Sequence, residues 1–226
     1  MHVHTNYSHD SNTTLHEVKA ITRKHDLTVA ITDHNRIGGS LAARAMNIPV
    51  IPAIEVTSKN NKDILVYFYC FDHLIEFYQK TIKKALNPGI IWTSKTTLTE
   101  EEVIQAAQEY GAITSLAHPY AYIGKKSASL PEHVLQKIDA VEVMNFTMSN
   151  QRNNKAAKLC DELHKKHTAG SDSHHASTIG KVTVRAEAEN PYEFLQRTKT
   201  GNTIVVGLQR KNKDVYEKLR FHLNQI

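Results

Sequence analysis

The chain has 226 residues, 40% hydrophobic and 23% charged, with a formal net charge of +5 at pH 7. This suits one globular domain with a large buried core. No apolar run approaches the roughly 18 residues of a transmembrane helix, no signal peptide precedes His2, and two distant cysteines exclude a disulfide framework. We therefore expect a cytoplasmic protein with free thiols, whose modest positive charge suits an anionic substrate without specifying one.

The first half of the chain reads as alternating helices and strands. The expected elements are a helix from Thr13 or Thr14 to about Lys24, a strand over 27–32, a helix over 40–46, a strand over 50–56, a strand over 64–71 opened by Asp63, a helix over 73–86, and a helix from the Thr99 capping box to about Gly111.

The second half continues the pattern. The expected elements are strands over 112–116, 140–144, 168–171, 182–186 and 203–206, and helices over 131–138, 154–166 and 191–199. About seven strand–helix repeats without a linker predict a parallel α/β sheet or barrel and a single domain over 1–226. We expect the polar tail after Gly207 to be helical, and the segment 87–97, with Trp92, to be a mobile loop near the functional site.

The first ten residues are rich in potential metal ligands. His2 and His4 stand two apart, so on an extended strand both imidazoles point to one face. Asp10, or its neighbour His9, follows after a short turn and can close on the same site. The alternative is a surface strand or the remnant of a tag.

Further His and acidic side chains follow the ends of later predicted strands. They are Asp33-His34, Glu55, His118, and Asp172 with His174, and Asp63 can join them from the start of an antiparallel neighbour. Each alone could be a core histidine, a solvent-facing acid or a cap residue. Because parallel strands deliver their carboxyl ends to one face of a barrel, the joint occurrence favours one shared site.

Six short motifs give the chain a resemblance to a known family. They are His2-Val3-His4-Thr5, Ile31-Thr32-Asp33-His34, Ile54-Glu55-Val56-Thr57, Ala117-His118-Pro119, Val141-Glu142-Val143 and Gly170-Ser171-Asp172-Ser173-His174. In this order they resemble the PHP (polymerase and histidinol phosphatase) family. The resemblance implies a distorted (β/α)7 barrel, related to the TIM barrel, with two or three divalent metals.

The resemblance also implies how the ligands are shared. His2, His4, Glu55 and Asp172 would hold one metal; Glu55 would bridge to a second, held also by Asp63 and His118; Asp10, His34 and His174 would hold a third. The family often has His at the position of Asp63, and a carboxylate there favours Mn or Fe somewhat over Zn. The first motif leaves Asp10 or His9 as the ligand, and we favour Asp10.

Such a cluster suits hydrolysis of a phosphate ester, with a metal-bound hydroxide as the nucleophile. We expect a small phosphomonoester as substrate, for example a nucleotide. Arg36 and Arg152 could clamp the phosphate, and His175 could protonate the leaving group. Asp33 is expected to orient an imidazole, and Tyr120 and Tyr122 could stack on a base, although each of these residues could equally be solvated or supporting.

Two other functions remain open. An open site would admit an oligonucleotide end, so a 3′–5′ exonuclease acting on single strands is the second enzymatic hypothesis, to which the basic residues after Gly207 could contribute. A non-catalytic PHP regulatory module is the third, although the ligand set looks complete. The sequence does not specify the oligomeric state.

Overall fold

The structure is a computed structural model and describes residues 1–86, 95–122, 126–212 and 215–221. The expected mobile loop over 87–97, including Trp92, therefore lies largely outside the described residues. No helix within the described ranges is both long and apolar enough to cross a membrane.

Helices and strands alternate along most of the chain. The helices are α1 (Leu15–His25), α2 (Gly38–Ala45), α3 (Phe71–Phe77) continued through a π-helical turn (Tyr78–Ile82) into α4 (Lys83–Ala85), α5 (Glu100–Gln108), α6 (Glu132–Leu135), α7 (Asn150–Glu162) and α8 (Pro191–Thr200). The strands are β1 (Val29–Ala30), β2 (Val50–Ile51), β3 (Ala53–Thr57), β4 (Asp63–Tyr67), β5 (Ile113–Leu116), β6 (Ala140–Asn145), β7 (Lys166–Gly170), β8 (Val182–Arg185), β9 (Ile204–Asn212) and β10 (Val215–Phe221).

Capping side chains fix where the helices begin. Thr14 and Thr99 each complete a capping box with the glutamate three residues later. Ser149 caps α7, which therefore starts four residues before the expected position, because the Ser149 side chain accepts the N–H of Arg152.

The central sheet has the order β3-β4-β5-β6-β7. Its β5-β6-β7 part is parallel, but β4 runs antiparallel to both β3 and β5. The expected parallel pairing therefore holds within this sheet only for β5-β6-β7, because the turn after β3 is too short for a parallel crossover. The expectation that Asp63 opens an antiparallel neighbour is confirmed.

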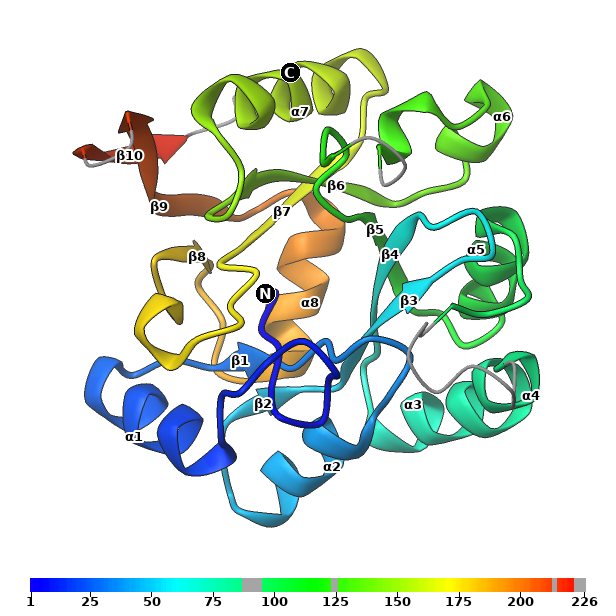
Figure 1. Ribbon diagram of the computed structural model, residues 1–226, viewed down its shortest axis with the longest axis horizontal. Helices are drawn as coiled ribbons and strands as arrows, with labels where there is room; N and C mark the ends of the chain where they lie inside the picture. Colours follow the sequence, from blue (N-terminus) through cyan, green and yellow to red (C-terminus); the bar gives the residue numbers. More distant parts are fainter. Residues whose placement is uncertain (87–94, 123–125, 213–214, 222–226) are drawn as a thin grey trace.

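The N-terminal segment joins two parts of the fold that are far apart in sequence. Val3 forms parallel bridges to Ile31, directly after β1, and to Ser173, after β7. A further parallel bridge joins His34 to Glu55 in β3, and β1 pairs with β2. In Figure 1 the strands surround the N-terminus and helices α1 to α7 lie outside them.

Alternation along the strands separates two layers of core. Ile54, Val56, Ile64 and Val66 face the outer helices in one cluster. Their neighbours Ala53, Leu65 and Tyr67 share another cluster with Ile113 and with Leu195 of α8. Glu55 and Asp63 have the parity of this second layer, so the sheet places both carboxylates on its inner face.

The described part of the tail after Gly207 is extended rather than helical as expected. Strands β8, β9 and β10 form a separate antiparallel sheet in the order β10-β9-β8, with Val182 opposite Gly207 and Leu219 opposite the same glycine. The tail is extended because β9 gains a hydrogen-bonding partner on each edge, which local polarity could not indicate.

Candidate metal centre

Four side chains converge on a single point at the inner face of the sheet. The Nε2 atoms of His2 and His4 lie 3.1 Å apart. Glu55 Oε2 lies 3.3 Å from the His2 nitrogen and 3.2 Å from the His4 nitrogen, and Asp172 Oδ1 lies 3.4 and 3.3 Å from the same two atoms. The ligands of a tetrahedral ion with bonds of about 2.1 Å are separated by about 3.4 Å, so these donors fit around one cation.

A second group shares Glu55 with the first. Glu55 Oε1 is buried, makes no hydrogen bond within the described residues, and lies 3.4 Å from His118 Nε2. Asp63 Oδ2 lies 3.8 Å from the same nitrogen. Glu55 thus presents one oxygen to each group, as a bridging carboxylate would.

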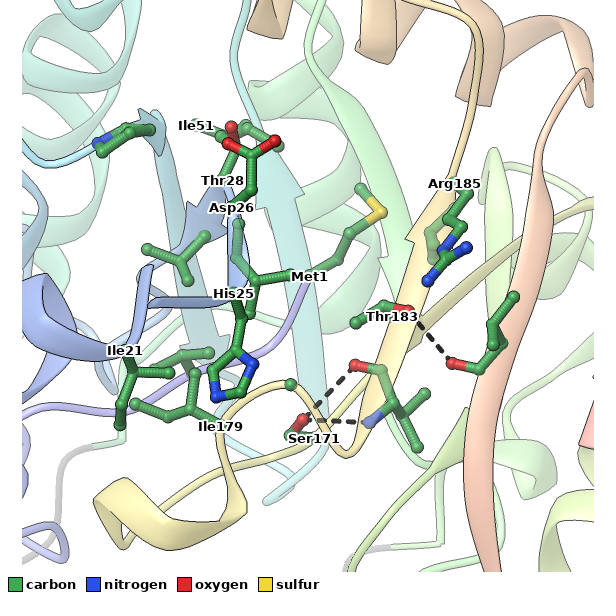
Figure 2. A pocket seen from close by; sticks show the side chains of 18 of the residues that line it. Met1, Ile21, His25, Asp26, Thr28, Ile51, Ser171, Ile179, Thr183 and Arg185 are labelled. Atoms are coloured by element: carbon green, nitrogen blue, oxygen red, sulfur yellow. Dashed lines mark hydrogen bonds between the residues drawn. The ribbon is translucent and has the colours of Figure 1, made fainter. Parts of the chain in front are cut away.

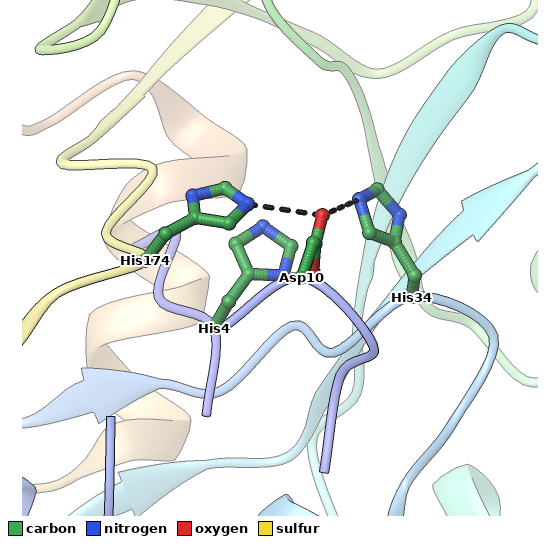
Figure 3. Close-up of side chains that lie close together, drawn as sticks. All are labelled: His4, Asp10, His34 and His174. Carbon is green, nitrogen blue, oxygen red and sulfur yellow. Dashed lines mark hydrogen bonds and ion pairs between the residues drawn. The ribbon is translucent and has the colours of Figure 1, made fainter. Parts of the chain in front are cut away.

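A third group is more open to solvent. Asp10 Oδ2 lies 3.1 Å from His174 Nε2 and 3.4 Å from His34 Nε2, with the His4 ring between them (Figure 3). Ser8 donates to the other oxygen of Asp10 and so fixes the carboxylate. Asp10 lies in a group with His4, His34 and His174, and the ring of His9 lies 5.6 Å from that of His34.

Glu142, to which the sequence assigned no role, links the first two groups. Its Oε1 lies 2.9 Å from His2 Nδ1, and its Oε2 accepts hydrogen bonds from the backbone N–H of His118 and from Asn145 Nδ2. A carboxylate on Nδ1 fixes the ring and leaves Nε2 free for a metal. Val141 and Val143 face the outer helices, so Glu142 between them points to the inner face of β6, and this position indicates its role.

Hydroxyl and amide groups fix the other carboxylates. Asp172 Oδ2 accepts from Asn145 Nδ2 and Thr147 Oγ1, which leaves Oδ1 directed at His2 and His4. Thr57 Oγ1 donates to Asp63 Oδ1, which leaves Oδ2 facing His118.

We expected Asp33 to orient an imidazole, but within the described residues its carboxylate hydrogen-bonds to Thr5 instead. Its carboxylate accepts the backbone N–H of Thr5 at 2.7 Å and the Thr5 hydroxyl at 2.8 Å. It therefore holds the segment that carries His2 and His4 against the end of β1. Burial raises the pKa of Asp33 to about 6, although these hydrogen bonds act in the opposite direction.

Two ligand candidates and one glycine have unusual backbone requirements. The backbone φ angles of His118 and Asp172 are 26° and 48°. Residues other than glycine adopt such positive values uncommonly and need support from the surrounding structure. A Cβ on Gly170 would lie 2.3 Å from the Cβ of His2. Glycine is thus required here for the N-terminal segment to pass β7.

Burial and neighbouring charges shift the pKa values of these groups in opposite directions. Burial lowers the pKa values of His4 and His118, but neighbouring carboxylates outweigh it and raise them to about 10 and about 9. Burial raises the pKa of Asp172, yet His2, His4 and His118 hold it well below its usual range. In the described part of the chain, the ion pairs of Glu55, Glu142 and Asp172 are all with histidines. The site therefore attracts positive charge, which protons or metal ions can supply.

The structure does not bring the three expected catalytic residues into these groups. Arg36 and His175 are exposed, and no hydrogen bond or ion pair within the described ranges joins their side chains to the nine ligand candidates. Arg152 is partly exposed on α7, with its guanidinium carbon 4.6 Å from the ring centre of Tyr122.

A further cavity lies outside the three ligand groups. It has a volume of about 1220 Å³ and is lined by residues at the amino ends of β1 and β2, by β8 and by the start of α8. Ser171 lies on its wall and bonds to the backbone of Val182 (Figure 2). None of the nine ligand candidates lines it, although their sequence neighbours Met1, Val3 and Ser171 do.

Comparison with known proteins supports the resemblance. The family model described as PHP-associated matches residues 150–203. No curated protein sequence is significantly similar to this chain. The similar solved structures share 15–17% sequence identity with it, so they establish the fold.

Three of these structures illustrate the likeness. A protein assigned as a metal-dependent phosphoesterase from Bifidobacterium adolescentis has a TM-score of 0.59 at 16% identity, over 89% of this chain and 95% of that one. A lesion-specific endonuclease from Pyrococcus furiosus has a TM-score of 0.73 at 17% identity, over 97% of this chain and 62% of its own. Endonuclease Q, bound to a 27-mer duplex with an abasic lesion, has a TM-score of 0.63 at 16% identity, over 89% of this chain and 55% of its own. The chain spans less than two thirds of the length of either endonuclease chain.

Proposed function

We propose that the chain is a metal-dependent phosphoesterase, from the resemblance to the PHP family, which the PHP-associated model over residues 150–203 and the similar folds support. We propose a small phosphomonoester, such as a nucleotide, as its substrate. The observation that carries the proposal is the convergence of four donor atoms. His2 Nε2 and His4 Nε2 lie 3.1 to 3.4 Å from each other and from Glu55 Oε2 and Asp172 Oδ1.

The described residues fit two or three divalent ions. His2, His4, Glu55 and Asp172 would hold the first, Glu55, Asp63 and His118 the second, and Asp10, His34 and His174 the third. The mixture of imidazole and carboxylate donors suits Mn, Fe or Zn. Bound together, such ions supply an activated water and stabilise negative charge on the phosphoryl oxygens.

The residues of the chain hold the ligands in place for this chemistry. Glu142 orients the His2 ring, Asn145 and Thr147 fix Asp172, and Thr57 fixes Asp63. His175, adjacent to His174 and exposed, remains a candidate to protonate the leaving group, and Arg36 remains a candidate to bind the phosphate.

We extend the proposal to the architecture. A distorted (β/α)7 barrel over a single domain, 1–226, is supported by the two bridges of Val3, which link the end of β1 to the end of β7. A cytoplasmic location remains a prediction from the two unpaired cysteines.

The test is reconstitution of the chelated protein with Mn, Fe or Zn, followed by phosphate release from a panel of phosphomonoesters. We expect Asp172→Ala and His34→Ala each to abolish hydrolysis while the folded circular-dichroism spectrum is kept, because each removes a ligand from a separate group. Surface Glu132→Gln serves as the control for the handling of variants. Wild-type turnover in both variants would refute the proposal.

A nuclease is the second candidate, and the endonuclease structures of similar fold favour it. A 5′-labelled single strand, incubated beside the phosphomonoester panel, separates the two. Release of nucleotide monomers without phosphate release from nucleotides would identify a 3′–5′ exonuclease. The absence of both activities in protein that binds metal would support a regulatory module.

A further inference from the structure

We propose that Tyr122 and Arg152 form a platform beside the metal centre that stacks on the planar ring of the substrate, which would make that substrate a nucleotide or another aromatic phosphate ester. This inference rests on the proposed function and deepens it. It also gives Arg152 a role different from clamping the phosphate.

Short hydrogen-bonded paths tie both residues to ligand candidates. Tyr122 stands four residues after His118, in a turn closed by the Ala121 N–H on the His118 carbonyl. Asn153, next to Arg152, exchanges two hydrogen bonds with the backbone of Asn145. Asn145 in turn donates to Asp172, so the platform and the metal centre are parts of one connected structure.

The geometry suits stacking rather than phosphate binding. The Arg152 guanidinium carbon lies 4.6 Å from the centre of the Tyr122 ring, and one of its nitrogens contacts the sulfur of Met148 at 3.9 Å. A guanidinium plane over an aromatic face fixes that ring. Tyr122 nevertheless remains 64% exposed. This is more than the other large hydrophobic side chains that are exposed in the described residues, Tyr7 and Tyr192. This exposure leaves much of the Tyr122 side chain accessible to a stacking base.

A neighbouring pair supports the turn that carries Tyr122. The Lys126 ammonium lies 5.5 Å from the centre of the Tyr120 ring, and the Ala128 N–H bonds to the Pro119 carbonyl. The segment is therefore anchored on both sides of residues 123–125. Lys126 beside Tyr120 and Arg152 beside Tyr122 also give this surface positive charge, which favours a compound that carries a phosphate.

The experiment measures the dissociation constants of AMP and of ribose 5-phosphate by calorimetry in the Mn-loaded His34→Ala background, in which we expect neither ligand to be hydrolysed. Both ligands carry a phosphate, and only AMP carries a base. We expect Tyr122→Ala to reduce the preference for AMP over ribose 5-phosphate about 10-fold, as expected for the loss of one stacked base. Tyr192→Ala, which removes another exposed tyrosine, on α8, is the control and should leave the preference unchanged.

Arg152→Ala separates the two roles of the arginine. Stacking predicts a loss of affinity mainly for AMP, whereas a phosphate clamp predicts equal losses for both ligands. The inference is overturned if Tyr122→Ala leaves the preference unchanged, if Arg152→Ala weakens both ligands equally, or if the His34→Ala background has no preference for AMP. If AMP binds selectively but no phosphomonoester is hydrolysed by the wild type, the proposed function fails and the platform stands.

Discussion

Glu142, in addition to the shared Glu55, links the first and second ligand groups. It contacts the His2 ring and the backbone of His118, and it is 1% exposed. Neither contact is made to a metal. Its role is to fix the direction in which the His2 nitrogen points.

We predict that Glu142→Gln lowers metal affinity by about 10- to 100-fold, because an amide is a weaker partner for Nδ1 and cannot accept from every donor that the carboxylate serves. Titration of the chelated protein with Mn measures the effect. Glu132→Gln on exposed α6 should bind metal as the wild type does. Equal affinity in Glu142→Gln would show that the His2 ring is positioned by other contacts.

At the level of elements, α8 packs against the inner face of the strands and stabilises it. Leu195 is fully buried in a cluster with Ala30, Ile51 and Leu65, which belong to three different strands. In Figure 1 this helix is seen through the ring of strands. It thus braces the strands that carry the ligands without supplying a ligand itself.

We predict that Leu195→Ala destabilises the protein by about 2–5 kcal/mol, the usual range for a large-to-small change in a core. Urea unfolding of the metal-loaded protein measures this, and Tyr192→Ala on the same helix, which is exposed, should cost little. The ratio of bound metal to folded protein should stay unchanged. A loss of metal at full stability would place α8 in the site itself.

For the molecule as a whole, metal binding and folding should be strongly coupled. The ligand candidates come from the N-terminal segment, the ends of β1, β3 and β5, the start of β4 and the segment after β7. Ions that bind this set only in the folded state stabilise it by mass action.

We predict that chelation lowers the melting temperature by about 8–16 °C. Metal at about 1,000 times its dissociation constant stabilises the folded state by about 4 kcal/mol. Each kcal/mol shifts the melting temperature of a protein of this size by about 2–4 °C. Differential scanning calorimetry with and without chelator tests this. The Asp172→Ala variant should show a much smaller difference, since its first group is incomplete. An equal difference in both proteins would mean that the stabilising ion binds elsewhere.

The sequence by itself determined most elements and the set of ligand types, because these depend on local rules. Threonine and glutamate three residues apart start helices at Thr14 and Thr99, and alternation puts His2 and His4 on one face. Only the tertiary structure decided how these residues meet. It paired the tail with β8, and it placed Thr5 against Asp33 and Tyr122 against Arg152. Strand direction, register and side-chain partners depend on contacts between segments up to 170 residues apart, such as His2 with Asp172, whose energies no local pattern contains.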